Sequence, residues 1–334
     1  MRSRHFITVV LAMACVLGTH FVTQAGESSY NLSLGGIQSA EDTATKAMQI
    51  MADKVKEKTG GSITIEVFPA SQLGDATTQI EAVGMGSQDM FVDAGGFIST
   101  FVPDKNSESM FFLFDSEAHY RAFLASDVTR QIEQEFLDQT GVKVIANNWV
   151  RVPRCMASKK PLNSLADFSG LKTRVPDIRA YLESIRALGA SPTQVPWGET
   201  YLALKQGVVD AAEGPLDQLY TMNFYEATMN VILTNHLRDN LIVTINNSKF
   251  ERMSDSQKKA LLEAANEAGD WYSATCQKAA ETNVKLMKDN GCNFIEIDIA
   301  PLQAAVLKRA EELEKEGAWK AGIMQKIADA KPAK

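Results

Sequence analysis

Few side chains in this sequence have the types and spacing that catalysis or metal binding requires. Beyond residue 25 the only histidines are His119 and His236, far apart in segments that we expect to be a surface helix and a loop. A histidine-based metal site is therefore not expected. Four motifs are also absent: Cys-x-x-Cys, His-Glu-x-x-His, Gly-x-Ser-x-Gly and the phosphate-binding Gly-x-x-x-x-Gly-Lys. We expect no metal, no cofactor and no catalysis.

The cysteines offer no obvious chemistry either. Three follow residue 25, namely Cys155, Cys276 and Cys292, and an odd number does not suit a disulfide scaffold. Cys276 lies inside a predicted helix that ends near residue 290, about 20 Å further along the axis at 1.5 Å per residue. Cys292 cannot return that far, so we expect free and mostly buried thiols.

Polar residues and glycines instead follow the predicted strands. Gln38 lies in the loop after the first strand, and Asp93 ends the third strand just before Gly95 and Gly96. Open α/β sheets bind ligands at the carboxyl ends of their strands. Taken singly, each such residue is better explained by turn formation or a solvated surface. Only their convergence predicts a ligand-binding cleft.

The elements that must position these residues alternate between strand and helix. Period-two alternation predicts strands, and apolar stripes at helical spacing behind capping residues predict helices. This order is typical of parallel βαβ units, so the predicted fold class is α/β. The expected strands are 30–34, 63–67, 89–93, 142–147, 171–175, 208–212, 241–245 and 294–297. The expected helices begin at Ser39, with Asp42 completing a capping box, at Asp75, at 179, at 199, at Ser254 and at 300, and the helix from Ser254 extends to about Asp289.

The first 25 residues are predicted to be a secretory signal peptide cleaved after Ala25. Arg2 and Arg4 precede an apolar stretch that is short for a membrane span, and small residues precede the cleavage point. Lipidation at Cys15 is the alternative. Removal leaves 309 residues with 32 basic against 41 acidic side chains, a net charge of −9. This size favours two domains, the charge argues against nucleic acid, and no later apolar run predicts membrane insertion.

Five motifs further along the chain carry a family resemblance. They are 57–61 (EKTGG), 68–74 (FPASQLG), 112–114 (FLF), 161–176, which ends in DFSGLKTRVP, and 199–215 (ETYLALKQGVVDAAEGP). In this order they resemble the substrate-binding proteins of tripartite ATP-independent periplasmic (TRAP) transporters, the family of dicarboxylate and sialic-acid binders. The likeness extends from about residue 34 to residue 298.

The resemblance implies a two-lobed periplasmic binding protein with crossing strands and a long bracing helix. We expect lobe I to comprise 26–150 plus about 240–280, and lobe II to comprise 151–239 plus about 281–334. The implied partners are a small organic carboxylate in the cleft between the lobes and the membrane subunits of a TRAP transporter. The implied location is the periplasm.

The same resemblance implies two arginines at the ligand. The family's Gly-Leu-Lys-x-Arg-Val-Pro arginine, which pairs with the ligand carboxylate, is Arg174 here. A guanidinium matches a carboxylate with two parallel donors and keeps its charge when desolvated. Its structural alternative is an ion pair with Asp177. The second family arginine fits Arg154 better than Arg151, with a surface arginine as the alternative.

Three further positions follow from the resemblance. Trp197 takes the place of an aromatic residue that lines the family's pocket, or else it belongs to the core. Glu213 matches an acidic position that orients an arginine or contacts the ligand. Gly214 departs from the family, whose members commonly have asparagine there, so a donor is missing and space is open.

Residues from the first lobe complete the candidate site: Gln38, Asp93, Phe97 and Trp149. Asp93 beside an anion site suits a ligand that also carries an ammonium or hydroxyls. Together with the aromatic walls it favours an amino-acid-like or aromatic carboxylate. A sugar acid, either uronate or aldonate, is the alternative. A periplasmic enzyme or a ligand sensor on the same two-lobed scaffold is the competing function.

Overall fold

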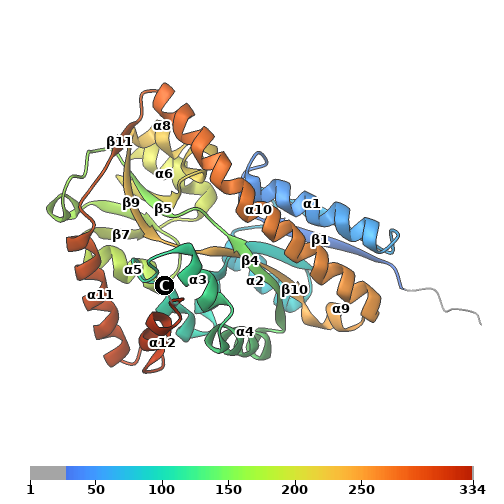
Figure 1. Cartoon of the computed structure of the whole chain (residues 1–334). Helices are drawn as coiled ribbons and strands as arrows, with labels where there is room; N and C mark the ends of the chain where they lie inside the picture. Colours follow the sequence, from blue (N-terminus) through green and yellow to red (C-terminus); the bar gives the residue numbers. More distant parts are fainter. Residues whose placement is uncertain (1–27, 333–334) are drawn as a thin grey trace, which may run out of the picture.

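The computed structural model describes residues 28–332 and contains two β-sheets surrounded by helices (Figure 1). This is the α/β, two-lobed architecture that the sequence predicted. The predicted signal peptide lies outside the described residues. None of the helices in residues 28–332 combines the length and the hydropathy of a membrane span.

The first sheet has five strands in the order β2-β1-β3-β10-β4. Strand β1 pairs in parallel with β2 and β3, whereas β10 is antiparallel to both β3 and β4. Alternating apolar side chains on β1 and β2 and a buried β3 explain why these segments form strands. The strands are β1 (Tyr30–Gly36), β2 (Ile63–Phe68), β3 (Met90–Ala94), β4 (Val142–Val150) and β10 (Asn240–Asn246).

The second sheet has six strands in the order β11-β9-β5-β8-β6-β7. Strand β5 is antiparallel to both of its neighbours, and β6 is parallel to β7 and β8. The strands are β5 (Arg154–Ser158), β6 (Lys172–Val175), β7 (Ser191–Gln194), β8 (Ala211–Pro215), β9 (Asn230–Leu237) and β11 (Asn293–Ile295).

The chain passes directly between the sheets twice. Residues 151–153 join β4 to β5, and residues 238–239 join β9 to β10. The backbone N–H of Arg151 donates to the carbonyl of Asp239 at 3.1 Å, so the two crossings lie side by side. This arrangement provides the crossing strands that the family resemblance implied.

The long helix α10 (Asp255–Asp289) runs along one side of the molecule beside both sheets (Figure 1). It begins at the predicted Ser254–Gln257 capping box and packs against α1 (Thr43–Lys58) and β4. Other helices near the first sheet are α2 (Ala76–Met85), α3 (Glu117–Leu124), α4 (Asp127–Thr140) and α9 (Asn247–Glu251), with the 3-10 turns η1 (Gly95–Thr100) and η2 (Pro103–Ser109).

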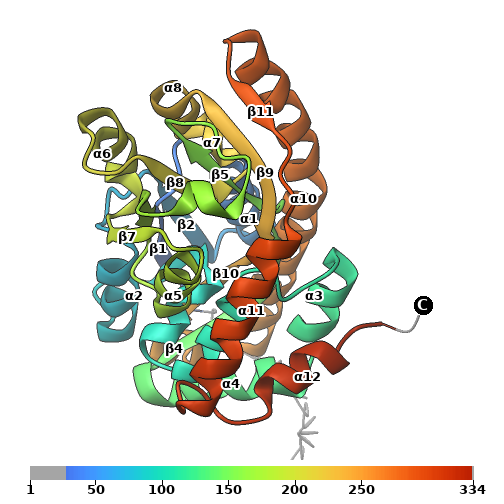
Figure 2. The same ribbon diagram turned by 90° about the vertical axis from the view of Figure 1, so that its left-hand side faces the viewer.

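The second sheet carries α5 (Arg179–Ala187), α6 (Thr200–Gln206), α7 (Gln218–Thr221), α8 (Phe224–Thr228) and the 3-10 turns η3 (Leu165–Phe168) and η4 (Trp197–Glu199). The C-terminal segment then returns toward α4, as Figure 2 shows. Here α11 (Ala300–Lys315) packs against α5, and α12 (Ile323–Asp329) packs against η2.

Several local expectations need correction. Helix α1 is capped by the side chain of Asp42, which accepts from the N–H of Ala44, so the cap predicted at Ser39 is wrong. The strand predicted at 208–212 begins later, at Ala211. Both histidines are buried instead of lying on a surface helix and a loop. His119 Nε2 lies 2.7 Å from the carbonyl of Ile327, and His236 is on β9.

Candidate ligand-binding site

A cavity of about 400 Å³ lies between the two sheets. The first sheet contributes the carboxyl end of β3 and the loop after β1, and α2 contributes its first turn. The second sheet contributes the end of β6, the segment before η4, and α5. The lining residues are Ile37, Gln38, Ser71, Asp75, Ala76, Thr77, Thr78, Asp93, Ala94, Phe97, Arg151, Arg154, Arg174, Pro176, Asp177, Ile178, Tyr181, Gln194, Val195, Pro196 and Trp197.

Arg174, on β6, is a buried cation without a carboxylate partner among residues 28–332. Its side chain is 2% exposed, its Nε donates to the carbonyl of Val195 at 2.8 Å, and it forms no ion pair with described residues. The alternative partner Asp177 instead accepts from Gln194. Burial lowers the pKa of Arg174 to about 10, which still leaves the guanidinium charged at neutral pH. A buried, uncompensated charge is costly, and an anionic ligand would compensate it.

Arg154 differs because the protein itself neutralises it. Its Nε and Nη2 donate to the two carboxylate oxygens of Glu213 at 2.5 and 2.7 Å, and Nη1 reaches Asp239 Oδ2 at 3.1 Å. Burial opposes the charge on Arg154, but Glu213 raises its pKa well above the usual range. Burial likewise opposes the charge on Glu213, but Arg154 and His236 depress its pKa strongly. Glu213 is fully buried and does not line the cavity, so its contact is with the arginine.

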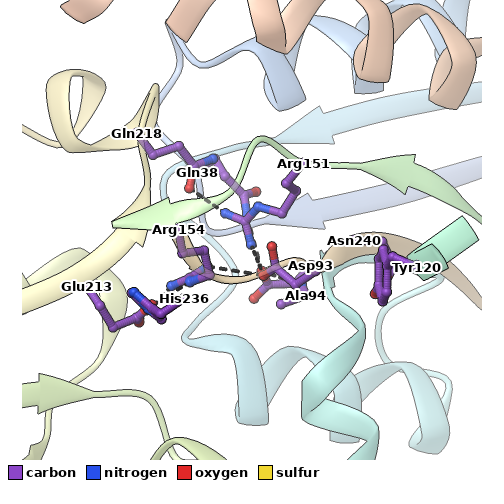
Figure 3. Close-up of polar contacts among 11 residues, drawn as sticks. Gln38, Asp93, Ala94, Tyr120, Arg151, Arg154, Glu213, Gln218, His236 and Asn240 are labelled. Carbon is purple, nitrogen blue, oxygen red and sulfur yellow. Dashed lines mark hydrogen bonds and ion pairs between the residues drawn. The ribbon is translucent and has the colours of Figure 1, made fainter. Parts of the chain in front are cut away.

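Arg151 also lines the cavity, although the sequence analysis preferred Arg154. Its Nη1 pairs with Asp239 Oδ2 at 3.1 Å, and its Nη2 donates to Gln218 Oε1 at 2.5 Å. The dashed contacts of Arg151 and Arg154 converge in Figure 3, where the two chain crossings meet. Asp239 therefore joins both arginines to the second crossing. Arg151, from the first crossing, and Arg154, at the start of β5, both line the cavity.

Asp93 presents an unused acceptor to this cavity. Its Oδ1 accepts from Gln38 Nε2 at 3.1 Å and from the N–H of Ala94 at 2.7 Å. Asp93 Oδ2 and Gln38 Oε1 are buried with no hydrogen-bond partner among the described residues. Burial raises the pKa of Asp93 to about 6, against the opposing effects of the Ala94 N–H and Arg151. A ligand hydroxyl or ammonium could donate to these oxygens.

The aromatic candidates separate into two groups. Trp197 and Phe97 line the cavity, and the Arg174 Cζ lies 5.2 Å from the centre of the Trp197 ring. Trp149 is in the core instead. It is fully buried 5.7 Å from the ring of Tyr272, and its Nε1 donates to the carbonyl of Ala265 at 2.9 Å. The expectation that Trp149 forms a cavity wall is therefore wrong, because the strand turns its side chain toward α10.

Small polar residues complete the lining, and sequence reasoning did not single them out. Ser71 belongs to the 68–74 motif, and Thr77 and Thr78 follow the correctly predicted Asp75 cap of α2. Gln194 ends β7. The signal that could have identified them is their position beside a strand end or a helix N-terminus. No group of histidine, cysteine, aspartate or glutamate in residues 28–332 could hold a metal ion.

Comparison with known proteins connects this geometry to a family. The family model "Bacterial extracellular solute-binding protein, family 7" matches residues 34–316. The sialic acid-binding periplasmic protein of Vibrio cholerae is 28% identical over 283 residues, 85% of this chain and 88% of that protein.

Two solved structures of TRAP periplasmic solute-binding proteins superpose closely. The one from Xanthobacter autotrophicus Py2, with bound β-D-galacturonate, has a TM-score of 0.83 and 27% identity over 91% of this chain and all of that one. The one from Roseobacter denitrificans, with bound L-galactonate, has a TM-score of 0.83 and 26% identity over the same shares. Members of this family are receptors that bind small organic acids and work with TRAP membrane subunits. The chain belongs to this family, the solute-binding proteins of TRAP transporters.

Proposed function

We propose that this receptor binds a hydroxylated monocarboxylate of the sugar-acid class. The observation that carries the proposal is the Arg174 guanidinium, which is buried beside a cavity of about 400 Å³ and has no carboxylate partner within residues 28–332. Arg174 and the ligand carboxylate form a bidentate ion pair, which removes the cost of burying the cation. Arg154 and Arg151 keep their internal partners and act at a distance through their charge.

The rest of the lining supports hydroxyl groups on the ligand. From sequence alone an amino-acid-like or aromatic carboxylate was favoured, because few small polar partners for a sugar acid could be identified. Ser71, Thr77, Thr78 and Gln194 provide such partners, in addition to the free oxygens of Asp93 and Gln38. Related proteins also bind sugar acids: sialic acid, β-D-galacturonate and L-galactonate.

We further propose a hinge at the two crossings, 151–153 and 238–239. A ligand held by Arg174 from one sheet and Asp93 from the other makes contacts with both lobes at once, and such contacts stabilise the closed state. The receptor is not an enzyme in this proposal: it releases its ligand unchanged to the membrane subunits. We assign it to the periplasm, with residues 1–25 as its signal peptide.

A thermal-shift and calorimetry panel of D-galacturonate, D-glucuronate, L-galactonate, sialic acid and the common amino acids tests the ligand class. A ligand at one hundred times its Kd adds about 2.7 kcal/mol to the free energy of unfolding. Mass spectrometry after incubation checks that the acid is unchanged. Binding of amino acids alone would contradict the sugar-acid proposal, and conversion of the acid would support the enzyme alternative.

Asp93→Asn separates a hydroxyl from an ammonium at this subsite. Asparagine keeps a neutral oxygen acceptor but loses the charge, so a ligand that donates a hydroxyl keeps most of its affinity. An amino acid would be weakened much more than the acid that lacks its amino group. Equal losses for both members of such a pair would show that no ammonium reaches residue 93, and a large loss for the sugar acid would contradict the proposed hydroxyl contact.

A further inference from the structure

The backbone conformation at Gly214 does not require a glycine. It lies in the middle of β8, paired with Cys155 on β5, and its φ is not among the positive values of the chain. A Cβ added at this position would lie 2.9 Å from Cη2 of Trp197 and 3.3 Å from Cδ2 of Leu219. The indole of Trp197 thus occupies the space that a side chain at residue 214 would need.

Packing, not hydrogen bonding, holds the Trp197 ring in this space. Its Nε1 is buried without a hydrogen-bond partner in residues 28–332. The ring of Phe224 meets it edge to face at 4.9 Å, and the absent side chain of Gly214 leaves room for its far edge. Because no hydrogen bond from the described residues fixes the ring, a methyl group at residue 214 would displace it.

The same ring lies against the arginine that we assign to the ligand carboxylate. Arg174 Cζ is 5.2 Å from the Trp197 ring centre, and Arg154 Cζ is 6.0 Å from it. Within residues 28–332 the Arg174 head group otherwise makes one hydrogen bond, from Nε to the carbonyl of Val195. A shift of the indole therefore changes the direction in which Arg174 presents its two Nη groups.

We propose that Trp197 and Gly214 form one unit that positions Arg174 and selects the group next to the ligand carboxylate. This inference rests on the proposed sugar-acid function. In this unit the indole of Trp197 forms the wall beside Arg174, and residue 214 has no side chain that could bind a ligand hydroxyl. A hydroxyl on the carbon adjacent to the carboxylate would have no partner at residue 214, and an unpaired buried hydroxyl reduces affinity.

The chemistry of the ligand follows from this wall. A uronate carries its carboxylate on a ring carbon that has a hydrogen and the ring oxygen but no hydroxyl. An aldonate such as L-galactonate carries a hydroxyl on the adjacent carbon. The Trp197–Gly214 unit therefore favours uronates over aldonates.

A double-mutant cycle tests the unit with D-galacturonate as the probe in titration calorimetry. Gly214→Ala should raise the Kd at least tenfold, and Trp197→Phe/Gly214→Ala should return to within about threefold of Trp197→Phe alone. Gly198→Ala is the matched control, because its added Cβ would meet only Ser71 Oγ at 3.7 Å. Its Kd should stay within about twofold of wild type. Additive effects of Trp197→Phe and Gly214→Ala on the Kd would overturn the proposal. Equal effects of Gly214→Ala and Gly198→Ala would overturn it as well.

The ratio of the Kd values for two acids separates the two roles, because a purely structural role of Trp197 and Gly214 would leave this ratio unchanged. Wild type should bind D-galacturonate at least tenfold more tightly than L-galactonate, and Trp197→Phe/Gly214→Ser, which adds a hydroxyl partner, should reduce that ratio several-fold. An unchanged ratio would contradict the selectivity. If wild type binds neither acid, the sugar-acid proposal fails. The melting temperatures of the same variants without ligand then test whether Trp197 and Gly214 pack as one unit. Additive shifts in melting temperature would show that they do not.

Discussion

Two arginine sites of this receptor lie near one another and behave in opposite ways. At the crossings, Arg151 and Arg154 each have carboxylate partners, with Asp239 shared between them and Glu213 bound to Arg154 through both oxygens. On the cavity wall, Arg174 has an indole and a carbonyl. The residue type is the same, so pairing distinguishes the scaffold from the ligand anchor. The comparison predicts that substitutions at the crossings affect folding and that substitutions on the wall affect binding.

Arg174→Ala should cause the largest change. It should abolish measurable carboxylate binding, while the free energy of unfolding stays the same or rises because an uncompensated buried charge is gone. Arg174→Lys should also bind poorly, since a point charge does not reproduce the two parallel donors. Calorimetry and urea unfolding measure the two quantities. Wild-type affinity in either variant would remove Arg174 from the anchor role.

Arg154→Ala should show the reverse behaviour. It leaves Glu213 as a fully buried carboxylate without its cation, and breaking a buried pair in this way costs about 3–5 kcal/mol of folding free energy. The measurement is urea unfolding, with Arg174→Ala as the matched arginine deletion. If the two deletions changed the free energy of unfolding equally, pairing would not separate scaffold from anchor.

Trp197→Ala tests whether this tryptophan contacts the ligand. Loss of this cavity-lining ring should weaken ligand binding by about 2 kcal/mol, roughly thirtyfold in Kd. Cys155→Ser, on β5, is the comparison. The buried Cys155 thiol donates to Asn235 Oδ1 at 3.4 Å and does not line the cavity, so the affinity should change little. Equal affinities of wild type and Trp197→Ala would return this tryptophan to the core.

The sequence predicted much of this architecture because its local signals are strong. The capping box of α10, the Asp75 cap of α2 and the alternation of β1 and β2 all lie where they were expected. The structure leaves Cys155, Cys276 and Cys292 free and buried, as predicted. The lobe boundaries stay a prediction. The sequence did not predict strands β5, β7 and β9. The burial of β9, for example, depends on the neighbouring β5, which local pattern does not reveal.

The site was harder to predict, because its residues converge only in three dimensions. Arg174, Asp93, Gln38 and Phe97 do line one cavity, and their roles toward a ligand stay predictions. Trp149 could not be excluded from sequence, since an aromatic residue near a strand end can face either side of the sheet. Arg151 was passed over because spacing alone does not show that it meets Asp239 across the second crossing.

Asp42 and Asp217 are two buried carboxyl groups near Arg151, and they give the smallest expected effect. Asp217 is 2% exposed, and burial together with the nearby Asp42 raises its pKa to about 7. Burial raises the pKa of Asp42 as well, although it accepts from Ala44 N–H and Thr221 Oγ1, and Arg151 opposes both shifts.

The sign of the pH effect follows from these raised values. An unfolded aspartate has a pKa of about 3.9, so between pH 4 and 7 the folded state holds the extra proton, and stability falls as pH rises through 7. Wild type should lose about 1 kcal/mol of unfolding free energy between pH 6 and 8 from this group. Asp217→Asn, which cannot ionise, should lose that much less over the same interval. Urea unfolding at pH 6, 7 and 8 measures the difference. Parallel pH profiles of wild type and variant would mean that Asp217 is ionised throughout this interval, and that the positive charge of Arg151 is enough to keep it so.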